Sequence, residues 1–238
     1  MNDFSRFQKV AGLSAVLLPV ATVINAVLFV ASVKSDRTDF NHPYGILSID
    51  PSAILSAGSS GANLFHWSMV FDLFAYLSFA PIALLCWNWF KAKSPNLVLL
   101  YTICGMTYSL LGAIGAVLLG AIVPFLVNDY ALANAGQKEI MQVLLGVLYQ
   151  VVVGGLWNPL EILLLGIWFL GIGPLLRRER PALGILTLII GVFAILDALG
   201  WITKIEIIFV TGVFGMSLLM IWAAWFGIDL LRQPVQID

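Results

Sequence analysis

Charged residues are scarce in this sequence: they occupy 11% of its 238 positions, whereas about 25% is usual in a soluble domain. Hydrophobic residues make up 61% of the chain, and a single soluble core of this size could not bury so much apolar surface. The net charge is −1, and the longest basic run is Arg177-Arg178-Glu179-Arg180. We therefore predict an integral membrane protein and expect no nucleic-acid partner.

Cysteine, histidine and the common catalytic motifs are also rare. Cys86 and Cys104 lie in apolar stretches without a C-x-x-C pair, so we interpret them as core residues and not as a disulfide or metal site. The two histidines, His42 and His66, lack a helical ligand spacing; we expect no metal or cofactor and keep a site at this pair as the alternative. No G-x-S-x-G, H-E-x-x-H or phosphate-binding glycine motif occurs. A non-enzymatic role is therefore favoured over an enzymatic one.

Long apolar runs dominate the sequence. A helix needs about 20 mostly apolar residues to cross a membrane, and six runs reach this length: 10–33, 64–90, 97–127, 140–176, 182–201 and 205–231. The first run is too long for a signal peptide, so we interpret it as a membrane span. We predict an all-α, six-transmembrane-helix bundle that forms one domain, 1–238, with an exterior loop over 34–63 and a mobile segment before the second span.

Basic residues predict the orientation of these helices. The two ends of the chain and the loops after the second and fourth spans carry eight Lys and Arg residues, whereas the other side carries four. The side that is richer in Lys and Arg is normally cytoplasmic. We therefore predict that both termini are cytoplasmic (N-in/C-in) and that the protein lies in the cell (inner or plasma) membrane.

Two spans show further features. The fourth run is 37 residues long, so its start should project outside the membrane or bend, with a kink at Pro159. The third run carries small residues spaced 4, 4, 3 and 4 apart on one helix face, which suits close packing inside the chain or, alternatively, a dimer seam. These residues are Gly105, Ser109, Ala113, Ala116 and Gly120.

The segment from Gly166 to Leu199 has a recognisable order. The apolar helix 166–176 ends in Gly-Pro-Leu-Leu and Arg177-Arg178, Pro181-Ala182-Leu183-Gly184 opens the next helix, and this helix closes near Asp197. The order resembles a bacterial family of six-span membrane proteins that is catalogued only as a domain of unknown function. The resemblance implies a six-helix bundle and no known activity.

Three carboxyl residues, Asp72, Glu161 and Asp197, lie well inside the second, fourth and fifth predicted spans, and the polar Asn25 lies inside the first. A charged group at the centre of a membrane helix costs at least about 2.5–3.5 kcal/mol, so each requires an explanation. Each lies 16 to 19 residues from the cytoplasmic end of its helix, which is about 24–28 Å at 1.5 Å per residue. All four are therefore expected in the outer half of a hydrocarbon core of about 30 Å.

Because these four residues are expected at one depth in the membrane, we predict that they line one pocket that is open to the outside. Tyr76 lies on the same helix face as Asp72, and Asn158 lies on the same face as Glu161, so both are added to the candidate site. The equally weighted alternative is a structural hydrogen-bond network that orders the bundle.

Three function classes remain open from the sequence. The first is a membrane protein that binds a lipid, a small apolar ligand or a partner subunit, alone or as a homo-oligomer or part of a larger membrane complex. The second is a proton- or cation-coupled carrier that uses Asp72, Glu161 and Asp197. The third is an intramembrane enzyme with Glu161 and Asp197 as paired carboxylates.

Overall fold

The computed structural model describes residues 3–33, 51–205 and 210–233, and the regular structure in these ranges is entirely helical. The helices are α1 (Asp3–Ser32), α2 (Pro51–Leu55), α3 (Gly58–Phe90), α4 (Pro95–Tyr130), α5 (Ala135–Val151), the π-helical segment η3 (Val152–Glu161), α6 (Ile162–Glu179), α7 (Pro181–Thr203) and α8 (Val210–Arg232). Six stretches of the described residues are long and apolar enough to cross a membrane, with α5, η3 and α6 forming one of 45 residues. The predicted six-span, all-helical architecture is confirmed.

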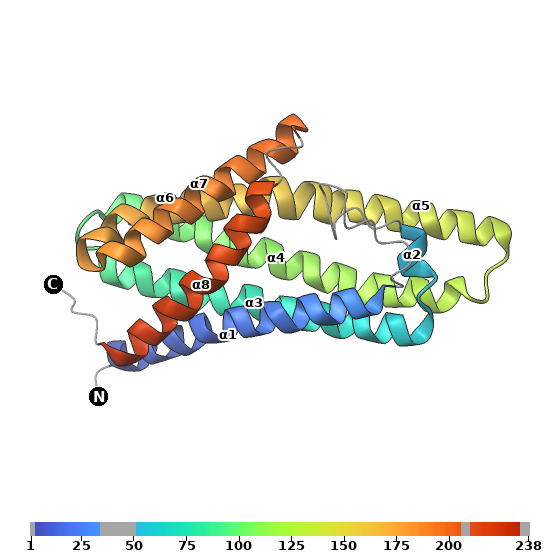
Figure 1. Cartoon of the computed structure of the whole chain (residues 1–238), viewed down its shortest axis with the longest axis horizontal. Helices are drawn as coiled ribbons and strands as arrows, with labels where there is room; N and C mark the ends of the chain where they lie inside the picture. Colours follow the sequence, from blue (N-terminus) through green and yellow to red (C-terminus); the bar gives the residue numbers. More distant parts are fainter. Residues whose placement is uncertain (1–2, 34–50, 206–209, 234–238) are drawn as a thin grey trace.

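The contacts between the helices form a closed ring. Going round the bundle, α1 packs on α3, α3 on α4, α4 on α6, α6 on α7, α7 on α8, and α8 again on α1. α8 leans across the bundle from α7 towards the start of α1 (Figure 1). α8 therefore packs against α1, at the start of the chain, as well as against α7.

The start of α1 and the end of α8 lie at the same end of the bundle, which we call the terminal end; the opposite end is the distal end (Figure 1). The buried Gln8 side chain donates to the carbonyl oxygens of Leu230 and Gln233 over 2.7 and 2.8 Å. Arg180, just before α7, pairs with Asp229 at 3.4 Å. These bonds connect three segments that are far apart in the sequence.

Large apolar side chains cover much of the outside of the bundle. On α1 alone, Val10, Leu13, Leu17, Val20, Val23 and Val27 are each about half exposed or more. In water such a surface would cause aggregation, whereas lipid tails solvate it without cost. The surface therefore agrees with the composition in indicating a membrane environment.

The small-residue face of α4 packs inside the chain, as one of the two interpretations predicted. All five of its residues are buried. The Ser109 hydroxyl donates to the Tyr76 carbonyl of α3 over 2.6 Å, and a Cβ on Gly105 would lie 2.5 Å from the Trp168 ring of α6. Small side chains here let α3 and α6 approach the α4 backbone closely.

The fourth span is interrupted, as Pro159 predicted, but by a π-helical segment. Proline has no N–H and crowds the preceding turn, and a widened turn absorbs both effects. Asn158 contributes by donating its side-chain N–H to the Val153 carbonyl over 2.8 Å. Before this segment, α5 begins with a capping box in which Asn134 and Gln137 bond reciprocally.

The segment predicted as an exterior loop, 34–63, is largely helical in its second part, and its first part lies outside the described residues. The stretch 56–61, expected to be mobile, contains the start of α3 at Gly58, whose φ of 75° makes the turn after α2. Gly61 packs so closely on α1 that a Cβ there would lie 2.8 Å from the Ser32 carbonyl oxygen. This packing outweighs the low helix propensity of glycine and serine.

Candidate functional site

Two apolar cores lie along the bundle, and on α1 and α3, which contribute to both, polar side chains lie between them in the sequence. On α3, for example, the distal core includes Phe65 and Met69, and the core nearer the terminal end begins at Phe79. Asp72 and Tyr76 fall between these positions. The break between the cores therefore coincides with the predicted polar residues.

Asn25 and Asp72 connect α1 to α3 at this level. The Asn25 amide donates to Asp72 Oδ1 over 2.8 Å, while Asn25 Oδ1 is buried without a hydrogen-bond partner among the described residues. Both residues are partly buried. This bond places the Asp72 carboxylate on the inner side of the α1–α3 contact.

Glu161 approaches from the fourth span. It is 3% exposed, its side chain interacts with that of Tyr76, and it lies within electrostatic range of Asp72 and Tyr108. The rings of Tyr76 and Tyr108 meet edge-on with centroids 5.6 Å apart. Asn25, Asp72, Tyr76, Tyr108 and Glu161 are hereafter the polar cluster.

The polar cluster has an unfilled hydrogen-bonding capacity. Glu161 Oε2 is buried and has no hydrogen-bond partner among the described residues. The same is true of the indole N–H of Trp157, which packs against the Tyr76 ring with centroids 6.1 Å apart. Unpaired buried polar groups are costly, so such a cluster suits a small polar or cationic guest.

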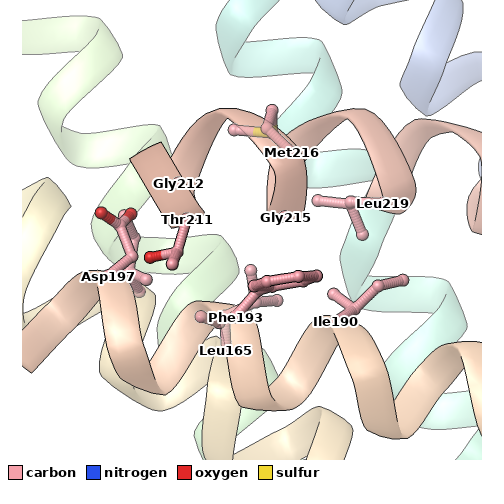
Figure 2. Close-up of a pocket in the computed structure, with 11 residues that line it drawn as sticks. Leu165, Ile190, Phe193, Asp197, Thr211, Gly212, Gly215, Met216 and Leu219 are labelled. Carbon is pink, nitrogen blue, oxygen red and sulfur yellow. The ribbon is translucent and has the colours of Figure 1, made fainter. Parts of the chain in front are cut away.

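Asp197 does not join this cluster but lines a separate cavity of about 40 Å³. Figure 2 shows its carboxyl group beside Gly212 and Thr211, at one end of a pocket between α7 and α8. The other lining residues are apolar: Ile162 and Leu165 from α6, Ile190, Phe193 and Ala194 from α7, and Gly215, Met216 and Leu219 from α8. We call this cavity the α6–α8 groove. The single pocket predicted from a shared level thus divides into two places.

The first turn of α8 receives the Asp197 carboxylate. A Cβ on Gly212 would lie 2.6 Å from Asp197 Oδ2, so only glycine allows this approach. A helix N-terminus carries about half a positive charge, which stabilises a nearby carboxylate in part. Gly212 was not among the residues singled out from the sequence, although Gly212 and Gly215 are three residues apart and therefore lie on one face of the helix.

The remaining candidates have local roles or fall outside the described residues. Asn158 bonds within its own helix, as described above. The His66 ring nitrogen Nδ1 lies 3.0 Å from the Gly120 carbonyl oxygen. His42 lies outside the described residues, among which no group of three metal-ligating side chains occurs. Tyr108 was missed, although it adjoins Ser109 of the small-residue face.

Comparison with known proteins gives a family and no activity. No curated protein and no solved structure matches this chain. A family model described as "Domain of unknown function (DUF4386)" matches residues 10–232, which is nearly the whole sequence and all six spans. The chain therefore belongs to the family of the domain of unknown function DUF4386.

Proposed function

We propose that this protein binds a lipid or a small apolar ligand from the membrane in the α6–α8 groove. The observation that carries the proposal is the lining of the groove, which is apolar apart from Asp197 and Thr211. A site of this kind, apolar with few polar groups, is typical of ligand pockets between helices. Met216 on its wall is 44% exposed, so an apolar molecule could enter from the lipid side.

The proposed orientation places both termini in the cytoplasm of a cell (inner or plasma) membrane. Arg177, Arg178, Lys91 and Arg232 are exposed at or near the terminal end. An excess of Lys and Arg marks the cytoplasmic side. In this orientation, Asp197 lies farther from the cytoplasmic end of α7 than Ile190 does.

Photocrosslinking tests the binding site. The purified protein in a non-ionic detergent is incubated with a long-chain alcohol that bears a diazirine, irradiated, and mapped by peptide mass spectrometry. We expect labelling on α7 and α8 at the groove. Met216→Trp should remove most of this labelling by filling the groove, while Ile221→Trp, on an exposed position of the same helix, should not. Equal labelling of both variants would exclude the groove as the binding site.

A proton- or cation-coupled carrier is the second candidate. It is favoured by the gathering of Asp72 and Glu161 beside the interrupted helix η3. Coupling sites of carriers are commonly formed by carboxylates and by broken helices near the middle of the membrane.

Proteoliposomes test this second candidate. The protein is reconstituted with a pH-sensitive dye inside, and an imposed ion or proton gradient is followed by fluorescence. Glu161→Gln should abolish any protein-dependent flux, and Asp129→Asn, which changes an exposed carboxylate at the distal end of α4, should preserve it. A flux that is unchanged in Glu161→Gln, or absent from the wild type, would remove support for the carrier.

A further inference from the structure

Among the described residues, the buried Asp197 carboxylate has no partner of opposite charge. The residue is 5% exposed, and neither a hydrogen bond nor an ion pair joins its side chain to any residue that the structure describes. The nearest basic residue in the sequence, Lys204, lies over the Trp201 ring, 5.7 Å from its centroid. A full negative charge in this position exceeds what a helix N-terminus compensates.

The groove is polar at one end and apolar at the other, as a lipid-like molecule is. Asp197 and Thr211 lie at one end, and Ile190 and Leu219 lie at the other (Figure 2). Asp197 and Ile190 are seven residues apart on α7, which is about 10 Å along the helix. The polar end lies nearer the distal end of the bundle, and the apolar end lies nearer the terminal end. A head group and the beginning of an alkyl chain would align with these two ends.

The volume limits how much of a ligand the groove encloses. A cavity must offer about 10–15 Å³ to hold one water molecule, so 40 Å³ accommodates a compact head group or a short piece of chain. The rest of a longer chain would lie along the half-buried Phe193 and the exposed Met216, in contact with lipid. Phe193, one helical turn before Asp197, lines the same groove.

We infer that the α6–α8 groove binds the cationic head of a single-chain amphiphile, an alkylammonium, with Asp197 as its counter-ion and the apolar walls around the start of its chain. This inference rests on the proposed ligand-binding function and adds the charge of the ligand. A neutral alcohol would leave the carboxylate charge unbalanced, and a fatty acid would bring a second negative charge beside it.

Competition against the diazirine alcohol distinguishes these ligand classes. The competitors are dodecyltrimethylammonium, whose charge is permanent, dodecanol and dodecanoate, all of one chain length. In the wild type we expect the ammonium to displace the photoprobe at a concentration at least about tenfold lower than dodecanol, as the attraction between one pair of opposite charges in a partly buried site allows. Dodecanoate should compete least.

Two variants isolate the carboxylate. Asp197→Asn should reduce the preference for ammonium over alcohol to near one, whereas Asp129→Asn, which removes an exposed carboxylate elsewhere, should retain the preference. Thermal unfolding without ligand verifies that both variants are folded. The ranking of the three competitors in the wild type does not depend on any variant.

The outcomes separate the inference from the function on which it rests. Equal competition by the three amphiphiles in the wild type would overturn the inference and leave ligand binding in the groove intact. An ammonium preference that persists in Asp197→Asn would also overturn it. If the photoprobe labels no residue of the groove, both the inference and the proposed function fail.

Discussion

Gly112 offers a sharp test of the polar cluster, because the Tyr76 ring lies directly over it. A Cβ on Gly112 would lie 2.1 Å from Cδ1 and Cε1 of Tyr76. An ordinary contact needs at least 3.4 Å, so Gly112→Ala must move the ring by about 1.3 Å (3.4 − 2.1) or separate the two helices. Tyr108 and Trp157 pack on the same ring, with centroids 5.6 and 6.1 Å away, and leave little room for this shift.

The net effect of Gly112→Ala is a balance of two contributions. Overpacking a filled interior costs about 1–3 kcal/mol, while replacing a helical glycine by alanine gains up to about 1 kcal/mol. We expect a loss of about 1–2 kcal/mol, and at about 2–4 °C per kcal/mol for a chain of this size the Tm falls by about 2–8 °C. Tryptophan fluorescence during heating in detergent measures this shift.

Gly146→Ala is the matched control, because it makes the same change in α5 where a new Cβ meets nothing within 4 Å. It should leave the Tm unchanged or raise it. In a Tyr76→Ala background the harm of Gly112→Ala should disappear, since the obstructing ring is gone. A Gly112→Ala variant as stable as Gly146→Ala would refute the placement of Tyr76 and with it the geometry of the cluster.

Three further predictions concern stability and topology. The Trp222 indole N–H donates to the Thr187 hydroxyl over 2.8 Å, and both residues are fully buried. Thr187→Val should therefore lower the free energy of unfolding by about 1–3 kcal/mol, measured by thermal unfolding. Thr187→Ser keeps the hydroxyl and should lower it less. Asp197→Asn should leave the ligand-free protein at least as stable as the wild type, because it removes a buried, unpaired charge; a large loss of Tm would show that the charge itself holds α8 in place. In a cysteine-free background, a cysteine that replaces Ser59 should react with an impermeant maleimide in intact cells, and a cysteine that replaces Arg178 should not. The reverse pattern would show that the proposed orientation in the membrane is wrong.

The membrane spans were predictable because lipid imposes a simple rule. Every backbone N–H and C=O in the hydrocarbon must be paired within the protein, so a run of about 20 apolar residues can only be a helix. The break in the fourth span was also predictable from Pro159, since its missing N–H must be accommodated wherever it lies. Its π-helical form depends on neighbours such as Asn158, which the pattern alone does not reveal.

The start of α3 was misjudged for a different reason. The stretch 56–61 is rich in glycine and serine, and composition alone predicts a loop. What decides the structure is the contact of Gly61 with the end of α1, for which the absence of a side chain is the advantage. A propensity describes an isolated segment, and here the contact between two helices outweighs it.

Counting along a helix predicts how deep a candidate side chain lies in the bundle, but it does not predict the direction in which that side chain points. Counting residues from the end of each helix predicted that Asn25, Asp72, Glu161 and Asp197 fall at one level, because the rise per residue is fixed. Counting could not reveal which neighbour each side chain faces, since that depends on helix rotation and on the order of helices round the bundle. α7 packs between α6 and α8, so Asp197 faces α8 and Gly212 instead of the polar cluster.

Because Asp197 lies apart from the polar cluster, the two proposed functions depend on different residues. Ligand binding in the groove depends on Asp197 and its apolar walls, whereas ion or proton coupling depends on Glu161 and its contacts with Asp72 and Tyr76. Mutations at distant sites that share no partner have nearly additive effects. If Asp197→Asn altered ion flux, or Glu161→Gln altered ligand preference, the two sites would be coupled through η3 and α6, which link them along the chain. Coupling of that kind is what a carrier requires of its ligand and ion sites, and its absence would favour a binding protein.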